Sequence, residues 1–215
     1  MHLGGLRVDQ MLQGRASGMM VTQLNGAPGA SSSIRIRGNN SIAASSEPLY
    51  VIDGLIGVGD LSTVNPADIA SISILKDASA TAIYGSRGSN GVILITTKEG
   101  IAGPAKISVN IQQGWQWLPR EVKLLSGAQY AELLNESRTA AGANIVYTDP
   151  GAVKTTDWQK ETMKVAPMTN VNASTSGGNE KITYFLSGNY YNKEGIIKRT
   201  GVERLQFRAN VESHF

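Results

Sequence analysis

Cysteine is absent from this sequence of 215 residues, and its two histidines, His2 and His214, stand at the two ends. The absence of cysteine excludes disulfide frameworks, thiolate metal sites and cysteine nucleophiles. Without an internal histidine, the chain has no base for a Ser-His-Asp triad and no imidazole for a metal site. A nucleophile elbow is also missing. We therefore expect no catalytic residue, no metal and no cofactor, and we do not expect an enzyme.

Long apolar runs are absent as well. No stretch approaches the roughly 20 apolar residues of a membrane-spanning helix, and the first residues do not match a secretory signal peptide. Taken alone, these absences predict a soluble cytoplasmic chain. Charge is sparse too, with 17% charged residues and a net charge of +3. Because basic residues gather only in pairs such as Lys198 and Arg199, we expect no nucleic-acid partner.

Glycine is plentiful, with 24 residues. The most informative stretch runs from Asn65 to Gly100. Its pattern predicts, in order, a helix that begins at Asn65 and Pro66, a strand over 71–75, a short helix over 78–84 and a buried β-branched strand over 92–97. Upstream, the pattern predicts a helix over 8–16 and strands over 19–24, 34–38 and 49–52. Together these elements predict an α+β domain of about 100 residues.

After Gly100 apolar and polar residues alternate along the chain. This period predicts antiparallel strands over 106–117, 182–190 and 204–211, with a weaker one over 170–176. An ordinary sheet with one face on a core explains the alternation as well as a membrane barrel does. Two details favour the barrel. Trp115, Trp117 and Tyr190 lie at one end of the apolar face, and long and short connections alternate. The longest connection contains a capping-box signal for a helix at 126–129.

Several residues allow both a chemical and a structural interpretation. The glycines of the 85–91 run suggest a phosphate loop, but their spacing fits no phosphate-binding motif, so tight-turn roles are favoured. Asp53, Asp60 and Asp68 are explained by turns and helix starts rather than by metal binding.

Arginine and tryptophan pairs also leave alternatives. Arg35 and Arg37 alternate with isoleucines and point to the same side of a strand. That side is either a solvated face or a surface that pairs with acidic groups across an interface. Trp115 and Trp117 either stack on sugars or bases or, as we favour, anchor a strand at a membrane interface.

The residues of several motifs resemble one known family. They are PLYVIDG (48–54), SIRIRGNNSI (33–42) and, above all, ILKDASATAIYGSRGSNGVILITTKEG (74–100). These motifs resemble the plug of the SusC/RagA family of TonB-dependent outer-membrane transporters. Residues 11–29 are similar to the helix and strand that open this plug, and residues 157–201 resemble the first barrel hairpins.

The resemblance implies an α+β plug domain followed by antiparallel strands of an incomplete transmembrane β-barrel. We expect the plug in residues 1–100, and the first strands and first outer loop of the barrel in residues 101–215. Family members have barrels of about 22 strands, so we expect a fragment of a longer receptor.

The implied location is the outer membrane of a Gram-negative, Bacteroidetes-like cell. The implied partners are a SusD-like lipoprotein lid, outer-membrane lipid, a glycan or peptide substrate, and TonB, which acts through a missing N-terminal segment. The region 118–168 would form an outer loop that contacts the lid.

The resemblance also assigns roles to single residues. Arg35, Arg37 and Arg87 are candidates for a latch between the plug and acidic groups of the barrel wall. The turn glycines of the plug are Gly38, Gly54, Gly85, Gly88 and Gly91. The aromatic residues at the membrane interface are Trp115, Trp117 and Tyr190.

Three functions compete at this point. The first is TonB-dependent active import of an oligosaccharide or peptide, with the plug as the gate. The second is a soluble carbohydrate-binding or adhesin-type module, which would bury the apolar face of its strands against a second sheet. The third, a hydrolase that uses Asp or Ser, is disfavoured because internal His and Cys are absent.

Overall fold

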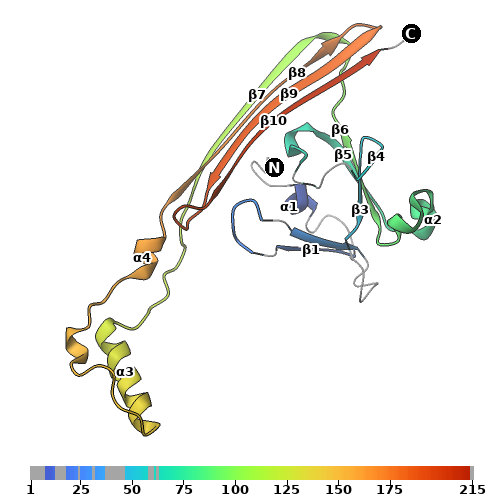
Figure 1. Cartoon of the computed structure of the whole chain (residues 1–215). Coiled ribbons are helices and arrows are strands. Elements are labelled where there is room, and N and C mark those ends of the chain that lie inside the picture. The colour runs from blue at the N-terminus through green and yellow to red at the C-terminus, as the bar shows by residue number, and fades with distance from the viewer. Residues whose placement is uncertain are drawn as a thin grey trace. The chain divides into compact units, whose positions relative to one another are not determined.

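The computed structural model describes residues 8–12, 18–23, 25–30, 32–36, 47–57, 61 and 63–213 (Figure 1). The chain divides into two compact units. The first lies within residues 1–114, 167–194 and 201–215, and the second within residues 115–166 and 195–200. The first unit contains an N-terminal part, which ends at Thr97, and a sheet of four long strands.

Two sheets and several short helices form the N-terminal part. Helix α1 (Val8–Leu12) is followed by an antiparallel pair, β1 (Met19–Gln23) and β2 (Ser32–Ile36). The second sheet has the order β4-β3-β6-β5, with β3 (Leu49–Ile52), β4 (Leu55–Ile56), β5 (Ile69–Leu75) and β6 (Val92–Thr97). Strands β3 and β6 run parallel, and the other neighbours run antiparallel. This arrangement confirms the α+β class.

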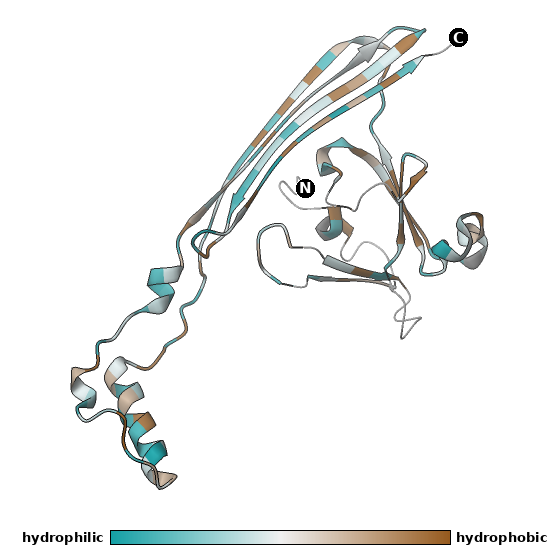
Figure 2. Cartoon of the chain, viewed as in Figure 1, coloured by the Kyte–Doolittle hydropathy of each residue, from teal (hydrophilic) through white to brown (hydrophobic). Residues whose placement is uncertain are grey.

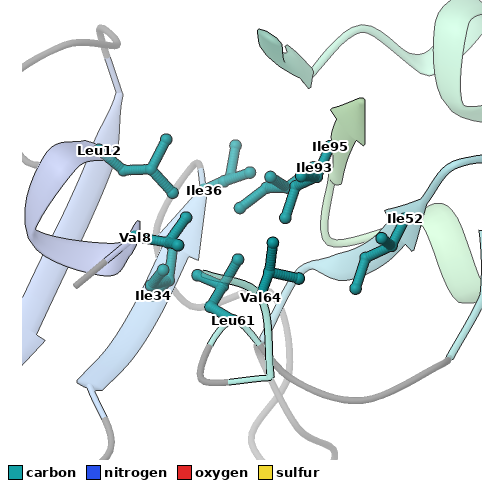
Figure 3. Packing of buried hydrophobic residues seen from close by; sticks show 9 residues of the cluster. All are labelled: Val8, Leu12, Ile34, Ile36, Ile52, Leu61, Val64, Ile93 and Ile95. Carbon is teal, nitrogen blue, oxygen red and sulfur yellow. The ribbon is translucent and has the colours of Figure 1, made fainter. Parts of the chain in front are cut away.

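A single apolar cluster joins these elements (Figure 3). Its members come from α1, β2, β3, β6 and the segment before η1 (Pro66–Asp68): Val8, Leu12, Ile34, Ile36, Ile52, Leu61, Val64, Ile93 and Ile95. Strand β6 was predicted as a buried β-branched run, and the structure confirms both its bounds and its burial. The cap is confirmed as well, because the Asn65 side chain accepts a hydrogen bond from the Ala67 N–H at 3.1 Å.

One predicted helix differs from the structure, and another is described only in part. The helix expected over 78–84 is only one turn of α-helix, α2 (Ala78–Thr81), followed by the 3₁₀ segment η2 (Ala82–Gly88). Within η2, the φ of 60° and ψ of −149° at Gly85 break the helical path a second time. Of the helix expected over 8–16, the structure describes α1 (Val8–Leu12), and residues 13–17 lie outside the described residues.

The four long strands form an antiparallel meander, which is the name used below for β7–β10. Its strands are β7 (Gly103–Gln116), β8 (Ala166–Gly178), β9 (Ile182–Glu194) and β10 (Gly201–Ser213), in the order β10-β9-β8-β7. The connections 117–165, 179–181 and 195–200 contain 49, 3 and 6 residues. The predicted strands and the unequal connections are therefore present, and each strand is longer than its sequence pattern indicated.

The two faces of the meander differ in polarity and in burial. The apolar face is exposed, as shown by Ile107 at 78% and Phe207 at 79% relative accessibility. The opposite face buries polar side chains, including Ser187 and Asn189 of β9. Figure 2 shows the alternation as brown and teal bands along the strands. The predicted period of two residues is confirmed.

Helices of the described part of the chain are all too short or too polar to cross a bilayer.

The second unit carries helix α3 (Gly127–Ala140), the 3₁₀ turn η3 (Pro150–Ala152) and helix α4 (Trp158–Thr162). The predicted capping box is confirmed, because Ser126 Oγ accepts from the Gln129 N–H and Gln129 Oε1 accepts from the Ser126 N–H. Asp157 caps α4, and the hydrogen bond from the Lys160 N–H lowers the pKa of its carboxyl. Both helices therefore begin at stabilised caps.

Candidate functional site at the junction of the N-terminal part and the meander

A two-residue turn positions the first functional side chain, Asp53. Asp53 and Gly54 connect β3 to β4 with φ values of 49° and 81°. Positive φ at both central residues defines the hairpin turn for which Asp-Gly is a preferred pair. The Asp53 carboxylate then reaches the neighbouring strand β6. It accepts from the Thr97 N–H and from the Thr97 hydroxyl, each at 2.8 Å.

Strand β10 of the meander meets this carboxylate from the other side. Arg208 Nη1 lies 3.0 Å from Asp53 Oδ2 and 2.9 Å from Thr97 Oγ1. Asn210 Nδ2 donates to the Lys98 carbonyl at 2.8 Å and to Thr97 Oγ1 at 3.3 Å. A hydroxyl has one donor and two acceptor positions. The buried Thr97 hydroxyl therefore uses its full capacity at this junction.

A second contact lies beside the first. Ser187 Oγ of β9 donates to Asp68 Oδ2 at 2.7 Å, and both residues are buried. Asp68 also accepts from the Lys98 N–H through its carbonyl, at 2.8 Å. Further along β10, Gln206 Nε2 donates to the Thr63 carbonyl at 2.7 Å. Strands β9 and β10 thus supply side chains to three places on the N-terminal part.

The segment that leaves β6 also approaches the meander closely. A Cβ atom on Gly100 would lie 2.7 Å from the Thr183 carbonyl carbon and in contact with the Tyr184 nitrogen. These are backbone atoms of β9, so a side chain at this position has no space. Gly100 therefore allows the chain to pass directly against β9.

Chemically, this site holds two parts of the chain together. It combines one ion pair, a buried hydroxyl and several amide or carbonyl contacts. Among the described residues, no three His, Asp or Glu side chains converge as metal ligands do. Hydrogen bonds that involve charged groups are the stronger ones in proteins, and the junction has two of them, Asp53–Arg208 and Asp68–Ser187.

The three arginines that the sequence suggested lie elsewhere. Arg35 is exposed on β2 between the buried Ile34 and Ile36. Arg87 of η2 is exposed, and its guanidinium lies against Gly57 of the N-terminal part itself. Arg37 lies outside the described residues. The latch role of all three stays a prediction.

Sequence reasoning missed the junction because it assigned Asp53 to a turn alone. The turn role is correct, but the same carboxylate also carries the ion pair. The other partner, Arg208, was placed on the polar face of its strand, which is correct as well. No local pattern links two residues that are 155 positions apart in the chain.

The predicted turn glycines have different surroundings. Positive φ values occur at Gly54, Gly85 and Gly91. Gly88 is buried, and a Cβ there would lie 2.9 Å from the Thr81 carbonyl oxygen, whereas Gly38 lies outside the described residues. At Gly91, φ is 93° and a Cβ would lie 2.9 Å from Ile36 Cδ1. An apolar neighbour of this kind fits a packed turn better than a phosphate cradle.

The predicted interface aromatics lie on or beside the strands of the meander. Trp115 is the second-last residue of β7, and Trp117 directly follows that strand. Both side chains are exposed. Tyr190 lies on β9, where its hydroxyl contacts Glu203 of β10 at 3.0 Å. Whether these side chains contact lipid stays a prediction.

Comparisons with known proteins agree with this architecture. Residues 2–92 match the family profile of the TonB-dependent receptor plug domain. The chain is 49% identical over 213 residues to TonB-dependent receptor P26 of Formosa agariphila, and 39% identical over 216 residues to TonB-dependent receptor SusC of Bacteroides thetaiotaomicron. Each match covers 96% of this chain and 21% of the relative. The chain therefore spans about a fifth of these relatives.

A solved structure extends the comparison to three dimensions. The RagAB peptide importer in its "open-open" state matches 99% of this chain and 27% of its own chain, with a TM-score of 0.83 and 30% identity. The family profile ends at residue 92, and the domain boundary expected at residue 100 stays a prediction. The fold, the sequence matches and this structural match together show that the chain is part of a SusC/RagA-type TonB-dependent receptor, a plug followed by antiparallel strands of its transmembrane barrel.

Proposed function

We propose that the receptor containing this chain actively imports a nutrient across the outer membrane, with the plug as its gate. The observation that carries this proposal is the division of the meander into two faces. Its polar face bonds to the plug through Ser187, Arg208 and Asn210, and its apolar face is exposed. Barrel strands need this division, because one face meets lipid and the other meets a polar lumen.

The soluble-module alternative requires the opposite arrangement. A soluble sandwich would turn its polar face to water and bury its apolar face on a second sheet. Here the exposed apolar side chains include Val109, Ile111 and Leu205. These large side chains on one face count against that alternative, and they support outer-membrane lipid as the surrounding medium.

The relatives support a proposal for the energy source and the partners. TonB would pull on the plug through a segment N-terminal to it, and a SusD-like lipoprotein would cover the outer opening. RagAB is described as a peptide importer, which supports a peptide as one substrate class. An oligosaccharide is the other class that the family resemblance supports.

Nutrient uptake by cells that carry or lack the complete receptor tests the import function. We expect the receptor to speed the disappearance of one class, either oligosaccharides or peptides, from a defined mixture followed by mass spectrometry. A protonophore should abolish the difference, because TonB draws on the inner-membrane proton gradient. Equal depletion with and without the receptor, or depletion that resists the protonophore, would contradict active import.

Contact with the lid is the second part of this proposal. The loop 117–165 exposes many large apolar side chains, and Tyr130 and Leu133 of α3 are among them. Exposed apolar groups of this kind commonly mark protein interfaces. Replacing both by serine should reduce several-fold the amount of SusD-like lipoprotein that is isolated with the receptor.

Two polar residues of the same helix provide the control for this prediction. Glu132 and Glu136 are exposed, and replacing both by glutamine keeps their size. Lid recovery should stay at the parent level in that variant. Equal recovery with the serine variant would show that this helix does not contact the lid, and cleavage of the loop by protease added to whole cells would report whether it lies outside.

A further inference from the structure

On the plug side of the junction, the Asp53 carboxylate is oriented by contacts within the plug. Asp53 is fixed by its turn and by two hydrogen bonds to Thr97 of the neighbouring strand. The carboxylate therefore needs no rearrangement to accept the guanidinium of Arg208, which lies 3.0 Å away. A group that is already oriented loses little conformational entropy when it binds its partner.

The meander side of the junction is organised around Arg208. Its cross-strand partner on β9 is Ser187, and side chains of such pairs are direct neighbours. Arg208 binds Asp53, whereas Ser187 binds Asp68. Two carboxylates of the plug are thus received by two adjacent residues on one row of the meander.

Asp68 makes the second contact between the plug and this row of the meander. It is only 4% exposed, and its Oδ1 atom is buried without a hydrogen-bond partner, while Oδ2 accepts from Ser187. A buried carboxylate is costly unless charges and donors stabilise it. The donor that the meander brings to this carboxylate is Ser187, the cross-strand partner of Arg208.

We propose that Arg208 is the cation that keeps the plug seated, and that Asp53 and Thr97 form its receptor on the plug, with the Ser187–Asp68 hydrogen bond beside it. In this contact the positive charge lies on the meander and the negative charge on the plug. A latch built from plug arginines and acidic wall residues would have the opposite arrangement of charges. The proposal rests on the proposed function, because a seated plug closes an import channel. It assigns the closing contact to strands β9 and β10.

Leak of a large glycopeptide antibiotic tests this assignment in cells that lack TonB, so that energised opening does not contribute. We expect Asp53→Asn and Arg208→Met each to raise the leak roughly tenfold, as expected for the loss of a hydrogen bond between charged groups. The double variant should leak no more than either single variant, because both changes remove one shared contact.

Matched variants control this experiment. Glu203→Gln removes a charge from the outward face of the same strand, where the carboxylate contacts Tyr190, and it should not leak. The surface level and the heat-modifiable gel shift report barrel assembly. If either charge variant assembles poorly, Thr97→Val provides the same comparison, because it removes only the shared hydroxyl and should also leak.

The outcomes separate this inference from the import function. Parent-level leak in assembled Asp53→Asn and Arg208→Met receptors would overturn the inference, and so would a leak caused by Arg35→Gln but not by Arg208→Met. Neither result depends on transport, because the assay contains no TonB. Failure of the parent receptor to take up a nutrient in cells with TonB would instead contradict the import function.

Discussion

Replacing Gly100 by alanine is expected to displace the segment that leaves the plug from its place against β9. The new Cβ would lie 2.7 Å from the Thr183 carbonyl carbon, and backbone atoms in the middle of a sheet cannot move aside cheaply. Overpacking of this kind costs about 3 kcal/mol. The displacement also pulls Lys98 away from Asn210, whose amide donates to the Lys98 carbonyl.

Limited proteolysis of the detergent-solubilised receptor measures this effect. We expect cleavage within residues 97–103 in the Gly100→Ala receptor at protease concentrations that leave the parent intact. Gly26→Ala is the matched control, since a Cβ at Gly26 has no neighbour within 4 Å. Resistance of the Gly100→Ala receptor equal to that of the Gly26→Ala receptor would show that the close approach is dispensable.

Local patterns predicted the elements of this chain well, because local physics determines them. The bounds of β6 follow from a β-branched run between turn residues, and the Asn65 and Ser126 caps follow from side chains that bond their own backbone. The polar and apolar faces of the meander follow from a period of two residues. Each of these features is decided within a few residues.

The junction between the plug and the meander was not predictable in the same way. Asp53 has a sufficient local role as a turn residue, so nothing in its neighbourhood indicates a second one. Arg208 is one of several polar residues on its face of β10, and the contact that distinguishes it is made 155 positions away. The sequence drew attention to Arg35 and Arg87, whose latch role stays a prediction, and not to Asp53.

The short helix α2 shows a limit of a different kind. The small residues from Ala78 to Thr81 favour a helix, and the structure contains one there. The 3₁₀ segment that follows is interrupted at Gly85, whose φ of 60° is open to glycine. Sequence reasoning found the glycine but placed it after the helix rather than within the helical segment.

Replacing Ile93 by alanine is expected to have the largest effect on the plug. Ile93 is fully buried in β6, in the cluster that joins α1 and β2 to the larger sheet (Figure 3). Truncation of a buried isoleucine to alanine costs about 2–5 kcal/mol, because apolar contacts are lost and a cavity remains. The population of plugs with an open core should therefore rise by roughly 30-fold or more.

The urea midpoint for protease cleavage inside residues 47–100 of the solubilised receptor measures this loss. Ile83→Ala is the matched control, because Ile83 has the same side chain but is 78% exposed, and surface changes rarely exceed about 0.5 kcal/mol. We expect a clear fall in the midpoint for Ile93→Ala and none for Ile83→Ala. Equal midpoints would mean that the barrel, rather than the apolar cluster, holds the plug in its fold.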